Sequence, residues 1–161
     1  MMRLIISVLL FAGYMVYCIV RLRSLPESVS RTVQALHVSW TWLLVMWPIA
    51  AMTGTLMLDV TPNDNLKIVP AAFMASMMVL GAAPWVSNGQ NAVHNVAGTL
   101  TVLLSQAWVA ITDVTVLTWW TVAVALVVVD YRRWCLWCEL VAALATFDTL
   151  HRVLLYISFI V

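Results

Sequence analysis

Residues 94–129 read HNVAGTLTVLLSQAWVAITDVTVLTWWTVAVALVVV and contain one carboxylate, Asp113, and neither lysine nor arginine. A stretch this long and this apolar is typical of membrane-spanning helices. As a single helix, its 36 residues would be ~54 Å long at ~1.5 Å per residue, whereas the hydrocarbon core of a bilayer is only ~30 Å thick. We therefore expect a tight turn at 112–113, with 94–111 and 114–129 as two antiparallel spans.

The whole chain shares this apolar character. Of its 161 residues, 64% are hydrophobic and 9% are charged. Soluble domains are about 45–50% apolar and about 25% charged, and a water-soluble fold of this size could not hide so much apolar surface. The lipid bilayer is therefore the expected environment. A net charge of +1, with eight basic residues spread along the chain, argues against nucleic acid as a partner.

The apolar stretches predict an all-α, polytopic integral membrane protein built as one domain over residues 1–161. Because a span needs about 20 apolar residues, we expect six transmembrane helices, or five if 94–129 does not turn. An amphipathic helix over 25–38 should lie at the membrane interface. The cleavage pattern after the first span is poor, so we interpret it as retained and not as a signal peptide. The predicted spans are 4–20, 40–58, 68–86, 94–111, 114–129 and 135–157.

Basic residues in short loops indicate the orientation, because they are enriched on the cytoplasmic side. With six spans, the first, third and fifth loops share one side. That side carries Arg21, Arg23, Arg31, Arg132 and Arg133, whereas the other side carries only Arg3 and Lys67. We therefore expect the cytoplasmic membrane, with both termini outside. Tryptophans near predicted span ends, Trp42 among them, are typical of an interfacial belt.

The C-terminal stretch FDTLHRVLLYISFIV places Asp148, His151 and Arg152 within five residues of an apolar span. Ionisable groups inside a membrane are costly and are functional candidates. The spacing places all three side chains on one helical face. We expect Asp148 and Arg152 to form an ion pair that faces the bundle interior, with His151 beside it.

A second polar cluster should form at the cytoplasmic face, where the topology gathers several loop residues. We expect these side chains to share one site, with Glu27 or Asp130 paired to an arginine. Ordinary helix capping and solvation are the alternative interpretation. The members of this cluster are Glu27, Ser28, Ser30, His94 and Arg132.

Redox or metal chemistry is the alternative to a non-enzymatic role. His37 and His94 open two predicted spans at similar depth and could ligate a metal or a haem. Cys135 and Cys138 have the C-x-x-C spacing of a thiol pair. A second cysteine pair, as thiol oxidases use, is missing from the sequence. We therefore assign neither catalytic residues nor metal ligands nor a cofactor in the main interpretation.

Several short motifs within residues 1–112 resemble a family of small polytopic membrane proteins of phages and prophages of gut Bacteroidales. These are SLPESVS after the first span, LGAAPWV at the end of the third, and the histidine that follows; they contribute Pro26, Ser28, Ser30, Gly81, Ala82, Ala83, Pro84 and His94. The resemblance implies a membrane location and brings no activity with it.

Together these patterns predict an integral inner-membrane protein without enzymatic activity. It would act through the membrane, an ion path or a membrane-protein partner. The more specific form of this hypothesis is a phage-encoded protein that alters the host envelope. Stripes of small residues on two predicted spans are typical of close helix packing and are consistent with a homo-oligomer. These stripes are Ala71, Ala75 and Ala82 on one span and Cys138, Ala142, Ala145 and Thr149 on the other.

Overall fold

The computed structural model describes residues 1–37, 39–85 and 90–160. Across these residues the chain is helical and contains no strand, which confirms the all-α class. Five helical segments are long and apolar enough to cross a membrane, consistent with a polytopic membrane protein. They are α1 (Met2–Leu22), α3 (Ser39–Val60), α4 (Ile68–Ala82) with its flanking turns η1 (Asp64–Lys67) and η2 (Ala83–Trp85), α5 (Gln90–Thr112) and α7 (Trp134–Ile160).

The expected break in the 94–129 stretch occurs where α5 ends at Thr112. Asp113 has an extended backbone, and its carboxylate accepts hydrogen bonds from the Thr115 amide (3.1 Å) and hydroxyl (2.5 Å). This side-chain cap starts a new element, the turn η3 (Val114–Thr118), which continues into α6 (Trp119–Val129). Together η3 and α6 form a shorter apolar segment than the other five.

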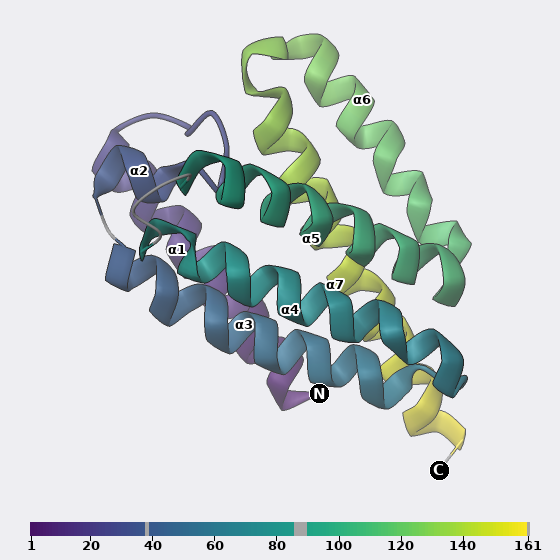
Figure 1. The fold of residues 1–161 in the computed structure, drawn as a ribbon. Helices are drawn as coiled ribbons and strands as arrows, with labels where there is room; N and C mark the ends of the chain where they lie inside the picture. The colour runs from purple at the N-terminus through teal and green to yellow at the C-terminus, as the bar shows by residue number, and fades with distance from the viewer. Residues whose placement is uncertain (38, 86–89, 161) are drawn as a thin grey trace.

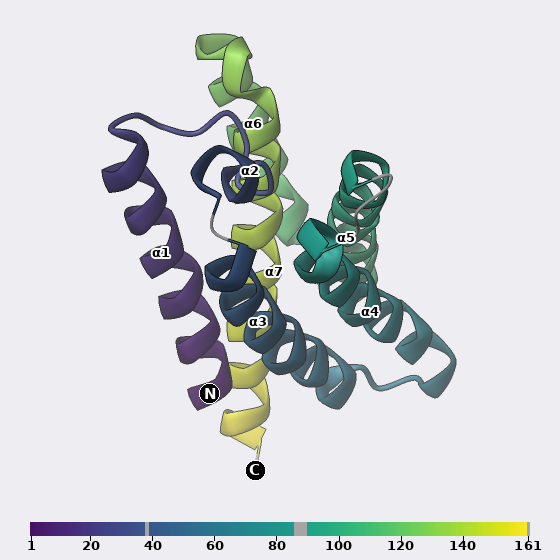
Figure 2. The ribbon, with the colours of Figure 1, turned by 60° about the vertical axis from the view of Figure 1, so that its left-hand side comes forward.

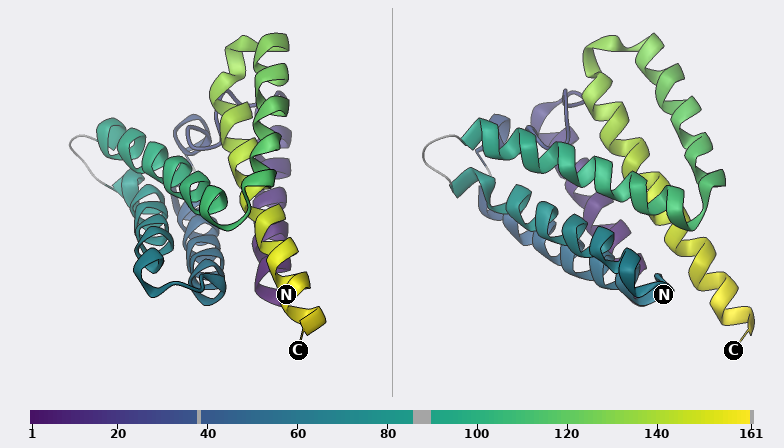
Figure 3. Two further views of the ribbon diagram at one scale, coloured as in Figure 1. Left: turned by 90° about the vertical axis from the view of Figure 1, so that its right-hand side faces the viewer. Right: turned by 45° about the vertical axis from the view of Figure 1, so that its right-hand side comes forward.

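The helices form two groups that meet along α7. Helices α3, α4 and α5 follow one another as packed neighbours, while α6 returns beside α7 (Figures 1 and 2). Helix α1 packs against α3 and α7, and α5 also contacts α7. The two termini lie at the same end of the bundle (Figure 3). The opposite end holds the first loop together with η4 (Tyr131–Arg133), where the Arg133 Nε donates to the Leu25 carbonyl (3.3 Å).

The first loop, which joins α1 to α3, is less helical than the sequence predicted. In its described residues the one helix is the short α2 (Thr32–Leu36), whereas residues 23–31 form turns, bends and irregular backbone. Arg23 and His37 have left-handed backbones at φ 52° and end α1 and α2. Serine side chains compete with helix formation by bonding to nearby groups, and here Ser28 and Ser30 bond to α7 instead.

Tryptophan side chains join helices within the core. Trp42 is fully buried, so its predicted position in an interfacial belt is wrong. Its indole N–H donates to the Leu80 carbonyl (3.2 Å), and the buried Trp108 donates to the Thr61 hydroxyl (2.9 Å). Most buried indoles find such a partner, and here each of the two bonds fixes the height of one helix against another.

Candidate functional site

The carboxylate of Glu139, in the second turn of α7, is the centre of the most elaborate polar cluster. The Val29 amide donates to Oε2 (2.5 Å) and the Ser30 hydroxyl donates to Oε1 (2.6 Å). The Ser28 hydroxyl lies 2.9 Å from both oxygens. The first loop thus wraps its three consecutive residues 28–30 around one acidic side chain. The Glu27 carbonyl adds to this contact by accepting from the Leu136 amide (3.2 Å), a donor that the first turn of α7 would otherwise leave free.

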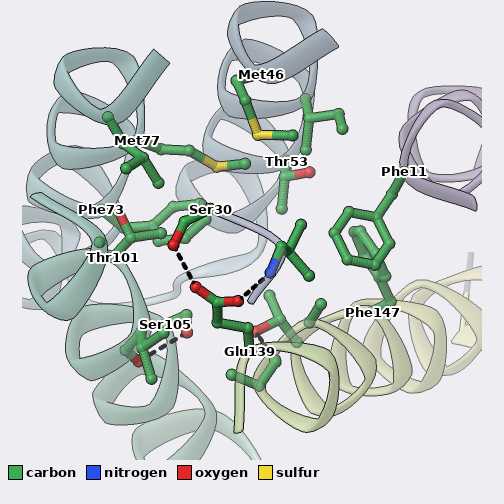
Figure 4. Close-up of a pocket in the computed structure, with 18 of the residues that line it drawn as sticks. Phe11, Ser30, Met46, Thr53, Phe73, Met77, Thr101, Ser105, Glu139 and Phe147 are labelled. Carbon is green, nitrogen blue, oxygen red and sulfur yellow. Dashed lines mark hydrogen bonds between the residues drawn. The ribbon is translucent and has the colours of Figure 1, made fainter. Parts of the chain in front are cut away.

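Glu139 also lines a half-enclosed cavity of about 100 Å³ in the bundle (Figure 4). Its walls come from α1, the first loop, α3, α4, α5 and α7. They are mostly aromatic, aliphatic and thioether groups, and the polar exceptions include five hydroxyl side chains. The large apolar lining residues are Phe11, Trp42, Met46, Ile49, Phe73, Met77, Leu80 and Phe147; the hydroxyl residues are Ser30, Thr53, Thr101, Ser105 and Thr146.

Thr53 differs from the other lining hydroxyls. The hydroxyls of Thr101, Ser105 and Thr146 each donate to a carbonyl of their own helix. The Thr53 residue is only 1% exposed, and its hydroxyl makes no hydrogen bond among the described residues. A buried hydroxyl without a partner costs about 1–3 kcal/mol, and the Thr53 oxygen is itself closed off from the cavity space.

The carboxyl group of Glu139 has no cationic partner among the described residues. Within the described part of the chain, Lys, Arg and His nitrogens all lie farther than 4.0 Å from its oxygens. The Val29 amide can only donate, so its bond favours the ionised carboxylate, while removal from water favours the neutral acid. A positive charge in the cavity would decide this balance in favour of the anion.

The predicted cytoplasmic-face cluster is divided by the structure. Ser28 and Ser30 meet at Glu139, but the Glu27 and Arg132 side chains are exposed and point elsewhere. Asp130 pairs with Arg133 (2.5 Å). His94 is 2% exposed, with its ring 6.4 Å from Trp42 and beside the Ser30 backbone, and neither ring nitrogen has a hydrogen-bond partner among the described residues.

The residues of the redox and metal alternative do not converge. His37 is exposed at the end of α2, whereas His94 is buried. Cys135 and Cys138 are partly buried free thiols on α7. In residues 1–37, 39–85 and 90–160, groups of three or more His, Cys, Asp or Glu side chains positioned to hold a metal ion are absent.

Asp148 and Arg152 form the expected i, i+4 pair, with Nε to Oδ1 at 3.1 Å. The Trp119 indole also donates to Asp148 (3.1 Å), and Arg152 lies 4.0 Å from Asp113. The pair is therefore level with the turn between α5 and η3, near one end of the bundle. Arg152 is 54% exposed at its side chain and His151 is exposed, so these two side chains do not face the interior as expected.

Sequence reasoning did not single out Glu139, although a signal was present. It is an ionisable residue inside a predicted span, and the rule that marked Asp148 as a candidate applies to it equally. Its position next to Cys138 drew attention to the thiols instead. Thr53 and the aromatic walls carried no signal, because their meaning depends on which helices meet.

No family model matches this chain, and neither a curated protein nor a solved structure matches it.

Proposed function

We propose that this chain is a non-enzymatic, multi-pass protein of the cytoplasmic membrane that binds a cation at Glu139 inside its helical bundle. The observation that carries the proposal is a carboxylate that faces a cavity, accepts only neutral donors and has no cationic partner among the described residues. A charge removed from water is tolerated when it is paired. The cavity offers the space for that partner.

The proposed location and orientation accord with this role. The first loop and the 130–133 loop carry most of the basic residues and belong to the cytoplasmic side in this proposal, with both termini outside. Glu139 then lies about two helical turns from the cytoplasmic end of α7. Cations would enter from the cytoplasm past the loop segment 28–30. The remaining proposed partners are the lipid bilayer and other copies of the chain, and a phage origin would fit an envelope-directed role.

Thermal unfolding of the purified protein in detergent tests the proposal. The midpoint Tm is measured in chloride salts of sodium, potassium, ammonium and methylated ammonium ions, with N-methylglucamine chloride at equal ionic strength as the reference. At least one of these cations should raise the Tm of the natural chain and leave that of Glu139→Gln unchanged.

The matched control is Asp64→Asn, which removes a carboxylate that is 89% exposed and away from the cavity. This variant should keep the full cation response. If Glu139→Gln and the natural chain respond alike to every cation, the proposal is wrong.

A redox or metal role remains the second candidate, because both thiols of the C-x-x-C pair on α7 are free. An absorption spectrum and elemental analysis of the purified protein test it. A haem band, or one metal equivalent lost in Cys135→Ser, would favour this role. A featureless spectrum without metal would remove it.

A further inference from the structure

We propose that the cation bound at Glu139 is a small organic ammonium ion, with a fully methylated amine as the best fit. This inference rests on the proposed cation site and adds the chemical class of its occupant. Three properties of the cavity support it: the composition of its walls, the scarcity of oxygen ligands and its volume.

Four aromatic side chains line the same cavity as Glu139. Phe11, Trp42, Phe73 and Phe147 all line the cavity, and Figure 4 shows phenyl rings and two thioethers around the space into which Glu139 points. The negative face of an aromatic ring attracts a cation, and sites for quaternary ammonium groups are built from several such rings. A methylated ammonium ion also gains from burying its methyl groups against apolar walls.

The same walls are a poor site for a metal cation. Hard cations such as Ca²⁺ and Mg²⁺ need about six or more oxygen ligands. Here the Glu139 oxygens already accept from residues 28–30, and most lining hydroxyls are committed to carbonyls of their own helices. Among the described lining residues, the Thr53 hydroxyl alone is unpartnered. The Thr53 oxygen is also fully buried, so one carboxylate would have to replace the hydration shell of such an ion. A fully methylated ammonium ion has no N–H groups and needs only a counter-charge.

The volume sets the size of the occupant. A buried apolar cavity of about 150 Å³ binds benzene, which has six heavy atoms. The cavity here measures about 100 Å³ and is only half enclosed, so an ion about as large as benzene would fill it and reach into its opening. Tetramethylammonium has this size, whereas tetrabutylammonium is far larger.

The test is isothermal titration of the purified full chain with tetramethylammonium chloride, supported by the shift in Tm. Sodium chloride provides a cation without methyl groups. Tert-butyl alcohol provides a molecule of similar size without charge, and tetrabutylammonium provides the same charge on an ion that is too large. Tetramethylammonium should bind at least about tenfold more tightly than each control. Glu139→Gln should weaken it at least tenfold, and Phe73→Leu, which keeps an apolar wall but removes a ring, should weaken it severalfold.

The outcomes separate this inference from the cation site itself. If sodium or simple ammonium ions bind in a Glu139-dependent way and tetramethylammonium does not, the organic ligand is wrong and the cation site stands. If tert-butyl alcohol binds as tightly as tetramethylammonium, or none of the cations binds, both are wrong. Because Glu139→Gln could fail to fold, Phe73→Leu provides an independent test. Unchanged tetramethylammonium affinity in this variant would overturn the proposed role of the aromatic walls.

Discussion

The backbone amide of Val29 donates a 2.5 Å hydrogen bond to the side chain of Glu139, a residue 110 positions later in the chain. This bond, with those from Ser28 and Ser30, fastens the first loop to the second turn of α7. One side chain therefore holds a loop in place and forms part of a cavity wall. A change in the charge of Glu139 would therefore affect both the position of the loop and the polarity of the cavity wall.

Replacing Glu139 by Gln keeps the shape of the side chain but removes one acceptor oxygen and the negative charge. At least one donor of residues 28–30 then loses its acceptor, and a buried donor left unsatisfied costs about 1–3 kcal/mol, so we expect a loss of stability of about that size in the ligand-free protein. The Tm in detergent should fall, and limited proteolysis should cut faster within the segment 24–31. An unchanged Tm and cleavage rate would mean that the loop is held by its apolar contacts alone.

Replacing Thr53 by Val keeps the shape of the side chain and removes a buried hydroxyl that has no partner among the described residues. Because such a hydroxyl costs about 1–3 kcal/mol, the ligand-free variant should be more stable and have a higher Tm. A lower Tm would show that the hydroxyl already has a partner, such as an ordered water.

The crossing of α3 and α4 depends on Gly54. A Cβ atom at this position would lie 2.7 Å from the Cβ of Met74, which is fixed to the backbone and cannot swing away. Overpacking of this kind costs about 1–3 kcal/mol, so Gly54→Ala should lower the Tm. The matched control is Gly98→Ala, where the nearest atom lies 3.8 Å away. Equal effects of the two substitutions would contradict the close approach.

Replacing Asp148 by Asn removes the partner of Arg152 and weakens the bond from Trp119. Because Arg152 is largely exposed, we expect a smaller fall in Tm than for Glu139→Gln. Exchanging the two charges with Asp148→Arg and Arg152→Asp should restore only part of it, since Asp113 then faces an acid. A fall in Tm larger than that of Glu139→Gln would mean that the pair is desolvated in the bilayer.

Reporter fusions test the proposed topology. A reporter fused after Val161 should be active outside the cytoplasmic membrane, and one fused after Arg133 should be active inside, because the basic residues gather at the 130–133 loop. A C-terminal reporter active only inside would contradict the six-span arrangement and leave α6 on one side of the membrane.

The helical class and the break at 112–113 could be predicted because both depend on local properties of the chain. Apolar length decides which segments span, and Asp113 caps the element that follows it. The Asp148–Arg152 pair was predictable for the same reason, since residues four apart in a helix are neighbours.

The site could not be predicted, because it depends on which distant segments meet. Nothing near Ser28 or Ser30 in the sequence indicates that Glu139 is their partner, and the position of Trp42 near a span end does not show that it is buried. The spacing of apolar residues in the first loop predicts a helix, but the hydrogen bonds to α7 outweigh this weak preference. Only the packing of α1, α3, α4, α5 and α7 brings the cavity walls together.

Helix α7 has 27 residues and is therefore ~40 Å long at ~1.5 Å per residue, longer than the ~30 Å hydrocarbon core. Such a helix is accommodated by tilting or by thickening of the lipid around it. Contacts hold α7 at two heights, through Glu139 to the first loop and through Asp148 to Trp119. Its inclination is thus set by the protein, and in a thinner membrane the surrounding lipid, not the helix, would have to adjust.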